Sequence, residues 1–208
     1  MVITIVNYGL GNIKAFYNIY KTLNIKVKIA SNAAQLSNSD KIILPGVGSF
    51  DWALERLNKS GMIETLNYLV LKKKIPVLGV CVGMQIMAET SEEGQLKGLG
   101  WLNAHVSKIK EEFLISKITQ NLLLPHMGWN NINIKNDSAL FKGLSKSQYY
   151  FLHSYCFCSL SDNATLTTTK YGQEFVSSFC LKNIYGVQFH PEKSHDWGIK
   201  LLKNFSDI

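Results

Sequence analysis

The stretch that decides the fold is "IPVLGVCVGM", residues 75 to 84. Its first part, up to Val80, is a short apolar run that predicts a buried β-strand. Cys81 follows at the end of this run, between Gly79 and Gly83, and the residues after Gly83 begin a helical pattern. The stretch therefore has the form of a nucleophile elbow, in which a reactive residue lies on a cramped strand-to-helix turn.

The elbow pattern assigns a chemical role to each of its parts. Side chains at Gly79 and Gly83 would collide across the turn, so both positions need small residues. The positive end of the following helix dipole favours the thiolate form of Cys81. The N–H group of Val82 points to the place where an oxyanion would form. A cysteine in an apolar run is more often a small buried hydrophobic residue, so the nucleophile hypothesis needs a base nearby.

A base and an orienting carboxylate occur together in "YGVQFHPEKS", residues 185 to 194. Pro191 holds His190 in an extended conformation and blocks a helix. Residues two apart in an extended segment project to the same side, so Glu192 can fix the tautomer of His190 and stabilise its charged form. An isolated His-Pro-Glu would be read as a strand-end histidine and a surface glutamate. Together with the elbow cysteine, it predicts a Cys81–His190–Glu192 triad.

A third segment, "LPGVGSF" at residues 44 to 50, ends another apolar strand. A glycine-flanked loop can turn the backbone N–H groups of Val47 and Gly48 towards the thiol and complete an oxyanion hole with Val82. A tight turn that uses Gly46 and Gly48 for positive φ explains the segment equally well, and the sequence leaves both interpretations open.

The rhythm of the chain predicts an α/β fold. Strands alternate with helices over the first 90 residues, which predicts a mostly parallel central sheet flanked by helices. From about residue 98 the segments are short and β-rich, which predicts an antiparallel extension of the sheet, and the last segment reads as an amphipathic closing helix. No linker or repeat interrupts the chain, so residues 1–208 are predicted to form one domain. The expected early strands cover residues 2–6, 25–30, 41–50 and 76–80.

Composition excludes several classes of function. Hydrophobic residues make up 46% and charged residues 18% of the 208 residues, enough for a real core. The net charge of +7 comes from scattered lysines without a zinc-finger or RNA-binding motif, so we expect no nucleic acid partner. No stretch approaches the roughly 20 apolar residues that span a membrane, and we expect a cytoplasmic protein without a membrane partner. The four cysteines lack metal-site spacing and are expected to be reduced and buried, with no metal and no cofactor.

Five motifs in this order carry a family resemblance: "PGVGSF", "GVCVGMQ", "PHMGWN", "FLHSY" and "GVQFHPEKS". With them the chain resembles a class I glutamine amidotransferase domain, nearly end to end from "NYGLGN" to "GIKLLKNF". Within that family, "PHMGWN" and "NYGLGN" look more like the glutaminase subunits of imidazole glycerol phosphate synthase than like purine, pyrimidine or anthranilate glutaminases.

The resemblance implies a reaction and a set of roles. Cys81 would attack the side-chain amide of L-glutamine, His190 would carry the proton and Glu192 would orient His190. The glutamine would be held by Gly48, Gln85, His153, Ser154 and Tyr155. The ammonia would pass to a (β/α)₈ synthase subunit in a heterodimer that makes imidazole glycerol phosphate and AICAR in histidine biosynthesis. By the same analogy, the interface with that barrel would include Asn12, Trp129, Tyr150 and Lys193.

Other readings stay open at this stage. Close paralogues feed ammonia to a second barrel that forms an amidine on a bacterial surface sugar, and "KGLGWLNAHV" and "SKITQNLLLP" depart from the family pattern and leave the barrel partner undecided. A cysteine peptidase would use the same elbow but has no need of "PGVGSF" and "HSY". A glutamine sensor without turnover is disfavoured by the intact triad. His126 is interpreted as a packed strand-end histidine.

Overall fold

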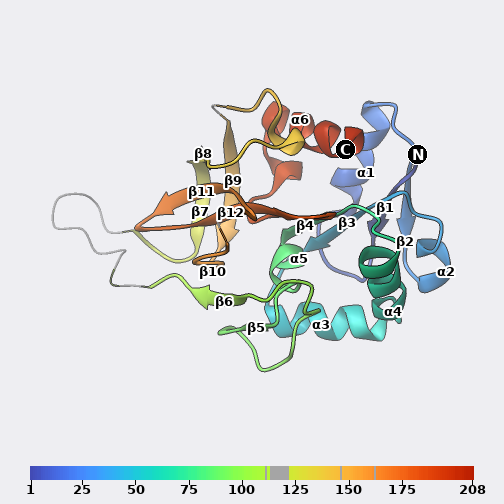
Figure 1. Ribbon diagram of the computed structural model, residues 1–208, viewed down its shortest axis with the longest axis horizontal. Helices are drawn as coiled ribbons and strands as arrows, with labels where there is room; N and C mark the ends of the chain where they lie inside the picture. Colours follow the sequence, from blue (N-terminus) through green and yellow to red (C-terminus); the bar gives the residue numbers. More distant parts are fainter. Residues whose placement is uncertain (111, 113–121, 146, 162) are drawn as a thin grey trace.

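The centre of the molecule is an eight-stranded sheet in the order β2-β1-β3-β4-β13-β12-β11-β8 (Figure 1). The computed structural model describes residues 1–110, 112, 122–145, 147–161 and 163–208, so most of "SKITQNLLLP" lies outside the described residues. The parallel strands are β2 (Val27–Ala30), β1 (Ile3–Val6), β3 (Lys41–Gly46), β4 (Val77–Cys81) and β13 (Ile184–Val187). The antiparallel strands are β12 (Gln173–Leu181), β11 (Thr165–Tyr171) and β8 (Asn133–Ile134).

Helices cover both faces of this sheet. Helices α1 (Ile13–Thr22) and α6 (His195–Asp207) lie on one face, and α3 (Phe50–Lys59), α4 (Ile63–Asn67) and α5 (Val82–Gln85) lie on the other (Figure 1). Because both faces are covered, the parallel strands β1, β3 and β4 are buried along their whole length. The predicted α/β class, with a mostly parallel sheet and helices on its faces, is confirmed. The shorter helical segments are α2 (Ala33–Leu36), η1 (Tyr68–Lys72), η3 (Ala139–Phe141) and η4 (Pro191–Lys193).

The second half of the chain adds the expected β-rich layer. Strands β7 (His126–Asn131) and β9 (Gln148–His153) form an antiparallel pair. Strand β6 (His105–Lys108) lies between β5 (Thr90–Ser91) and β10 (Tyr155–Cys156) in a small three-stranded sheet. These strands lie beyond the end of the central sheet that carries Cys81, so they form the second wall of the region around it.

Two local expectations need correction. Helix α5 is a single turn, because the carbonyls of Ile86 and Met87 accept hydrogen bonds from the later loop at Leu99 and Trp101 instead of continuing a helix. A helix this short contributes little dipole to the thiol. The cysteines are also not uniformly buried: Cys81 and Cys156 are, whereas Cys180 is half-buried and Cys158 is exposed at a bend after β10.

The sheet topology decides where chemistry can occur. Strands β3, β4 and β13 are neighbours and parallel, with Gly46 opposite Cys81 and Val80 opposite Val187. Their carboxyl ends therefore meet at one edge, where open α/β sheets bind ligands. His190 follows β13 at this edge. No helix in the described part of the chain is long and apolar enough to cross a membrane.

Candidate active site

Cys81 adopts a strained backbone conformation at the carboxyl end of β4. Its φ of 54° and ψ of −117° place a residue with a Cβ atom in a region that L-residues rarely occupy. Such strain persists only where the surrounding structure holds it, and it is frequent at functional sites. The side chain is 3% exposed. The sulfur therefore lies just beneath the surface of the carboxyl edge.

Glycines on two strands make this turn possible. A Cβ atom at Gly83 would lie 2.0 Å from the Leu44 carbonyl oxygen, and one at Gly46 would lie 2.1 Å from the Gly83 nitrogen. A Cβ atom at Gly79 would lie 2.7 Å from the Gly83 carbonyl oxygen. The sequence argument that small residues must flank the cysteine thus has a direct steric reason. The third glycine, Gly46, belongs to β3, so the elbow and the "PGVG" segment pack backbone to backbone.

His190 and Glu192 form a buried pair beside the elbow. His190 Nδ1 lies 2.9 Å from Glu192 Oε1, and the two side chains are only 5% and 3% exposed. Tyr150 of β9 accepts a hydrogen bond from the His190 N–H, while Ser194 donates its hydroxyl to the His190 carbonyl. The backbone of His190 is therefore fixed on both sides, and the hydrogen bond to Glu192 orients the ring.

The electrostatics of His190 favour its charged form beside the cysteine. Burial acts to lower the pKa of His190, but a charged Cys81, followed by Glu192, raises that pKa to about 10. His190 Nε2 makes no regular hydrogen bond among the described residues, so its interaction with the sulfur is chiefly electrostatic. An imidazolium beside a thiolate is the arrangement that a cysteine nucleophile needs.

Gln188 is a neighbour of the sulfur that the sequence argument missed. Its Nε2 lies 3.8 Å from Cys81 Sγ and its side chain is completely buried. On the opposite side, Sγ lies 3.7 Å from the carbonyl oxygen of Leu152 in the "FLHSY" segment. A signal was present, because a glutamine in an apolar strand, two residues before His190, shares the side of the strand that faces the site.

The residues predicted to hold glutamine fall into two groups. Gln85 Nε2 donates to the Tyr155 carbonyl at 2.8 Å and to Gln188 Oε1 at 3.0 Å, so Gln85 is tied to the wall opposite the elbow. His153 is buried and its ring contacts His126 and the Tyr155 carbonyl. Ser154 accepts a backbone hydrogen bond from residue 109 and is half-buried. The structure thus brings Gln85 and Tyr155 together near Cys81, whereas the His153 ring points into the interior.

The predicted oxyanion loop begins directly beside the elbow. Val47 is exposed, and Gly48 has a φ of +95°, a conformation that favours glycine. The loop is held at its start by Tyr8, whose hydroxyl donates to the Pro45 carbonyl at 2.6 Å, and at its end by Glu93, which accepts from the Phe50 N–H at 2.8 Å. Between these two anchors the loop is free to present its N–H groups.

A cavity of about 350 Å³ opens next to the His190–Glu192 pair. It links the triad to the predicted interface, since its lining includes Gly11, Asn12, Gly46, Val47, Glu192 and Lys193. Asn12 itself caps α1 by accepting from the N–H of residue 15 at 3.4 Å.

The other predicted interface residues lie on β7, β9 and the neighbouring helix η4. Lys193 lies 5.6 Å from the centre of the Tyr150 ring, and Tyr150 meets Trp129 edge to face at 6.3 Å. Trp129 is 46% exposed and stacks on His195. The structure therefore brings three of the four predicted interface residues into one aromatic and basic surface, with Asn12 at the nearby cavity.

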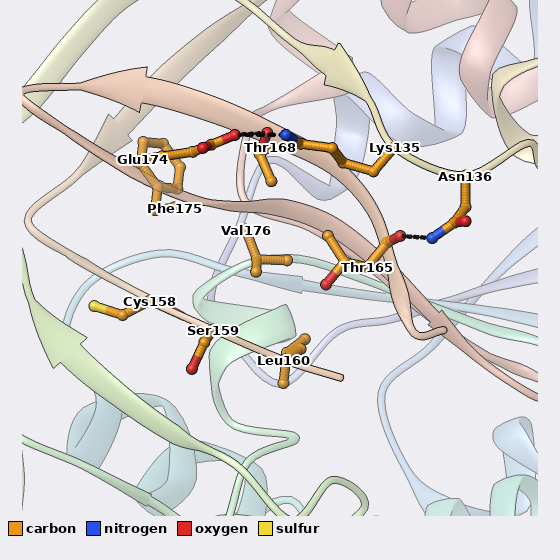
Figure 2. Close-up of a pocket in the computed structure, with 10 residues that line it drawn as sticks. All are labelled: Lys135, Asn136, Cys158, Ser159, Leu160, Thr165, Thr168, Glu174, Phe175 and Val176. Carbon is orange, nitrogen blue, oxygen red and sulfur yellow. Dashed lines mark hydrogen bonds and ion pairs between the residues drawn. The ribbon is translucent and has the colours of Figure 1, made fainter. Parts of the chain in front are cut away.

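A larger cavity, about 590 Å³, lies away from this edge and contains none of the predicted site residues (Figure 2). Its wall carries Lys135 and Glu174, which form an exposed ion pair at 3.0 Å, and the exposed Cys158. The two charged groups in its wall pair with each other, so the size of this cavity alone does not indicate a reaction site. Among the described residues, no group of three or more histidine, cysteine or acidic side chains is arranged to hold a metal ion.

Comparison with known proteins agrees with this geometry. Residues 4–207 match the family "Glutamine amidotransferase class-I". The chain is 52% identical over 207 residues to "Imidazole glycerol phosphate synthase subunit HisH" of Bdellovibrio bacteriovorus, covering 99% of this chain and 100% of that protein. It is 45% identical, with the same coverage, to the protein of that name from Leptospira interrogans.

Solved structures show the same fold at low sequence identity. A structure titled "Crystal structure of glutamine amidotransferase" matches with a TM-score of 0.74 at 17% identity, covering 99% of this chain and 100% of that one. PurLQS from Thermotoga maritima matches with a TM-score of 0.72 at 14% identity, covering 99% and 97% of the two chains.

Proposed function

The chain belongs to the class I glutamine amidotransferase family, and on that premise we propose that it is the glutaminase subunit of imidazole glycerol phosphate synthase. It hydrolyses L-glutamine to glutamate and ammonia for histidine biosynthesis. The observation that carries this proposal is the strained Cys81 at the end of β4, with the buried His190–Glu192 pair beside it.

The first half of the reaction forms a thioester. The Cys81 thiolate attacks the side-chain carbonyl carbon of glutamine, and the negative charge moves to the amide oxygen. The N–H of Val82 and those of Val47 and Gly48 stabilise that oxyanion. His190, with its raised pKa, donates its Nε2 proton to the leaving nitrogen, and ammonia departs. The products of this half are a glutamyl thioester on Cys81 and ammonia.

The second half releases glutamate. His190 is now neutral and takes a proton from water, which attacks the thioester carbonyl in the same oxyanion site. The thiolate leaves and the imidazolium is restored, so glutamine and water have become glutamate and ammonia. Glu192 stabilises the imidazolium in the resting state and keeps Nε2 directed at the reacting atoms.

Gln85 supports recognition of the amino-acid end of the substrate. Both of its N–H bonds are used, by the Tyr155 carbonyl and by Gln188, which leaves Oε1 as the free acceptor among the described residues. An acceptor held in this way suits the ammonium group of glutamine. The backbone at Gly48 and the 153–155 segment complete the binding site around it.

The liberated ammonia needs a protected exit, because water would protonate it. The cavity beside the His190–Glu192 pair is lined in part by Lys193, which lies 5.6 Å from the centre of the Tyr150 ring, and Tyr150 in turn contacts Trp129. We assign this surface, together with Asn12, to docking of the (β/α)₈ synthase subunit. Exposed tryptophans such as Trp129 are frequent anchors of protein interfaces.

The test is glutamate production by the purified chain with and without that barrel subunit and its nucleotide ligand. We expect slow hydrolysis by the chain alone and a strong rise in the complex, because docking orders the oxyanion loop. Cys81→Ala is expected to abolish glutamine-dependent synthesis while synthesis from ammonium salts persists. High activity that ignores the barrel, or full activity of Cys81→Ala, would contradict the proposal. A surface-sugar barrel in the same assay tests the paralogous pathway.

A further inference from the structure

A line of hydrogen bonds runs from β7 to the wall of the active site. Asn130 Nδ2 lies 3.2 Å from His126 Nε2, and His126 Nδ1 lies 3.0 Å from His153 Nε2. His153 Nδ1 lies 2.9 Å from the Tyr155 carbonyl oxygen. Neither histidine has a part in the hydrolysis described above.

The donor and the acceptor of each hydrogen bond in this line follow from the orientation of the Asn130 amide. Asn130 Oδ1 accepts the N–H of Asn131 at 2.8 Å, so its Nδ2 is the atom that faces His126 and donates. His126 Nε2 must then be an acceptor, which puts the proton of the neutral ring on Nδ1. That proton is donated to His153 Nε2, and the His153 proton on Nδ1 is donated to the Tyr155 carbonyl. With each ring in its Nδ1–H tautomer, the Asn130 amide, both histidine rings and the Tyr155 carbonyl all have a hydrogen-bond partner.

The surroundings hold both rings neutral. His126 is 2% exposed and stacks between Phe151 and Tyr171, with ring centres 4.7 and 4.0 Å away. Burial lowers the pKa of His126 to about 4. Burial and the neighbouring His126 lower the pKa of His153 to about 3. Two phenylalanines would fill this space at lower desolvation cost, so what the histidines add at these positions is their hydrogen bonds.

The line continues to the nucleophile through Gln85. The Tyr155 carbonyl that accepts from His153 also accepts from Gln85 Nε2 at 2.8 Å. The second N–H of Gln85 reaches Gln188 Oε1 at 3.0 Å, and Gln188 Nε2 approaches Cys81 Sγ at 3.8 Å. The orientation of the Gln85 amide, and thus of its free Oε1, depends on the Tyr155 carbonyl keeping its place.

We propose that His126 and His153 are positioning residues: their fixed tautomers hold the Tyr155 carbonyl, which sets the Gln85 amide for substrate glutamine. This role rests on the proposed function. We call the hydrogen-bonded series Asn130–His126–His153–Tyr155 the relay. Its loss should weaken glutamine binding more than it slows the chemical step, because the catalytic triad keeps its own contacts.

The first test does not depend on activity. Nitrogen-15 NMR of histidine-labelled protein reports which ring nitrogen carries the proton. We expect His126 and His153 as neutral Nδ1–H tautomers that do not titrate between about pH 5 and about pH 8, where a free histidine does. An Nε2–H tautomer at either ring, or titration of either ring inside that range, would overturn the relay.

The second test uses matched variants in glutamine hydrolysis by the complex. His126→Phe keeps the aromatic stack and removes both nitrogens, and we expect KM for glutamine to rise about tenfold with little change in kcat, the effect of one lost buried hydrogen bond. His126→Asn places an amide donor where Nδ1 was, and we expect it to restore most of the KM. A purely structural role would lower the amount of folded protein without moving KM.

A milder variant keeps the test decisive if His126→Phe does not fold. Asn130→Val removes the donor that fixes the tautomer, and we expect a KM increase of about threefold. The control is Asn133→Val, an exposed asparagine on β8, which we expect to leave KM unchanged. An unchanged KM in both His126→Phe and Asn130→Val would overturn the proposal. If the wild-type complex releases no glutamate, the proposed function fails. The NMR measurement of the His126 and His153 tautomers then tests the hydrogen-bond relay by itself.

Discussion

His190 Nδ1 donates a hydrogen bond to Glu192 Oε1 at 2.9 Å, across the single residue Pro191. Both side chains are almost completely buried, and the second carboxylate oxygen of Glu192 has no partner among the described residues. A carboxylate in this position is costly unless it stabilises a positive charge. Cys81 and then Glu192 raise the pKa of His190 to about 10 against the effect of burial, which favours the charged imidazolium at this position.

Replacing Glu192 by Gln tests this relationship. The amide keeps the shape but can no longer stabilise the imidazolium, so we expect kcat for glutamine to fall about a hundredfold or more, with KM little changed. Steady-state glutaminase kinetics of the complex measure both constants. The control is Glu174→Gln, an exposed residue of β12, where we expect wild-type kinetics. If Glu192→Gln kept its kcat, Glu192 would not orient the base.

Adding one methyl group at Gly83 tests the packing of the elbow. The new Cβ atom would lie 2.0 Å from the Leu44 carbonyl oxygen, so α5 and β3 must separate. We expect Gly83→Ala to lower the free energy of unfolding by about 3 kcal/mol or more. The control, Gly61→Ala, has open space and only a positive φ, so we expect a loss of about 1 kcal/mol. Urea unfolding measures both, and equal losses would contradict the steric account.

The sequence predicted the part of the central geometry that short-range patterns encode. The elbow needs Gly79 and Gly83, as the sequence predicts. His190 is extended as expected. The expectation that Pro191 blocks a helix is wrong, because Pro191 begins the short helix η4, where a proline at the first position fits, and Glu192 meets His190 from within that helix at 2.9 Å. The parallel pairing of β4 with β13 brings the two segments together, and the βα alternation of the first 90 residues does not predict it, because β13 belongs to the β-rich second half of the chain. The roles of the three residues remain predictions until they are tested.

The remaining features depend on contacts that no local pattern reports. The third glycine of the elbow, Gly46 on β3, is needed because Gly83 of helix α5 packs against it. Tyr8 reaches Pro45 from 37 residues away in sequence, and Gln188 contacts Cys81 from 107 residues away. His126 was correctly predicted as a packed histidine, but its hydrogen bond to His153 depends on the register of β7 against β9.

Acid should destabilise the protein through the two buried histidines. The pKa values of His126 and His153 are lowered from 6.5 to about 4 and about 3, chiefly by burial. The unfolded chain therefore binds more protons than the folded chain below about pH 6.5, and stability falls as the pH drops through this window. For His126 alone we expect a loss of about 3 kcal/mol between pH 7 and pH 4.

Urea unfolding at a series of pH values measures this slope. His126→Phe removes the titrating ring, so its stability should depend less steeply on pH over the same range. The opposite sign applies to His190, whose raised pKa makes its contribution complete below about pH 6.5 and lost as the pH rises through about 10. Equal acid slopes in wild type and His126→Phe would contradict the assignment to His126.

The proposed docking surface can be tested without disturbing the triad. Trp129→Ala removes an exposed anchor that stacks on His195, and we expect affinity for the barrel subunit to fall at least tenfold. Calorimetric titration measures the affinity. The control is Tyr68→Ala, an exposed aromatic residue on η1, which we expect to bind like wild type. If Trp129→Ala bound the barrel subunit with wild-type affinity, the docking surface would not include Trp129.

The most direct measurement is peptide mass spectrometry of the complex after acid quenching during turnover of isotope-labelled glutamine. Our account predicts a labelled glutamyl thioester on the peptide that contains Cys81, and its accumulation when the second half of the reaction is slowed. Steady release of glutamate with the label on another cysteine, or with no labelled cysteine even in a deacylation-impaired variant, would contradict the central claim.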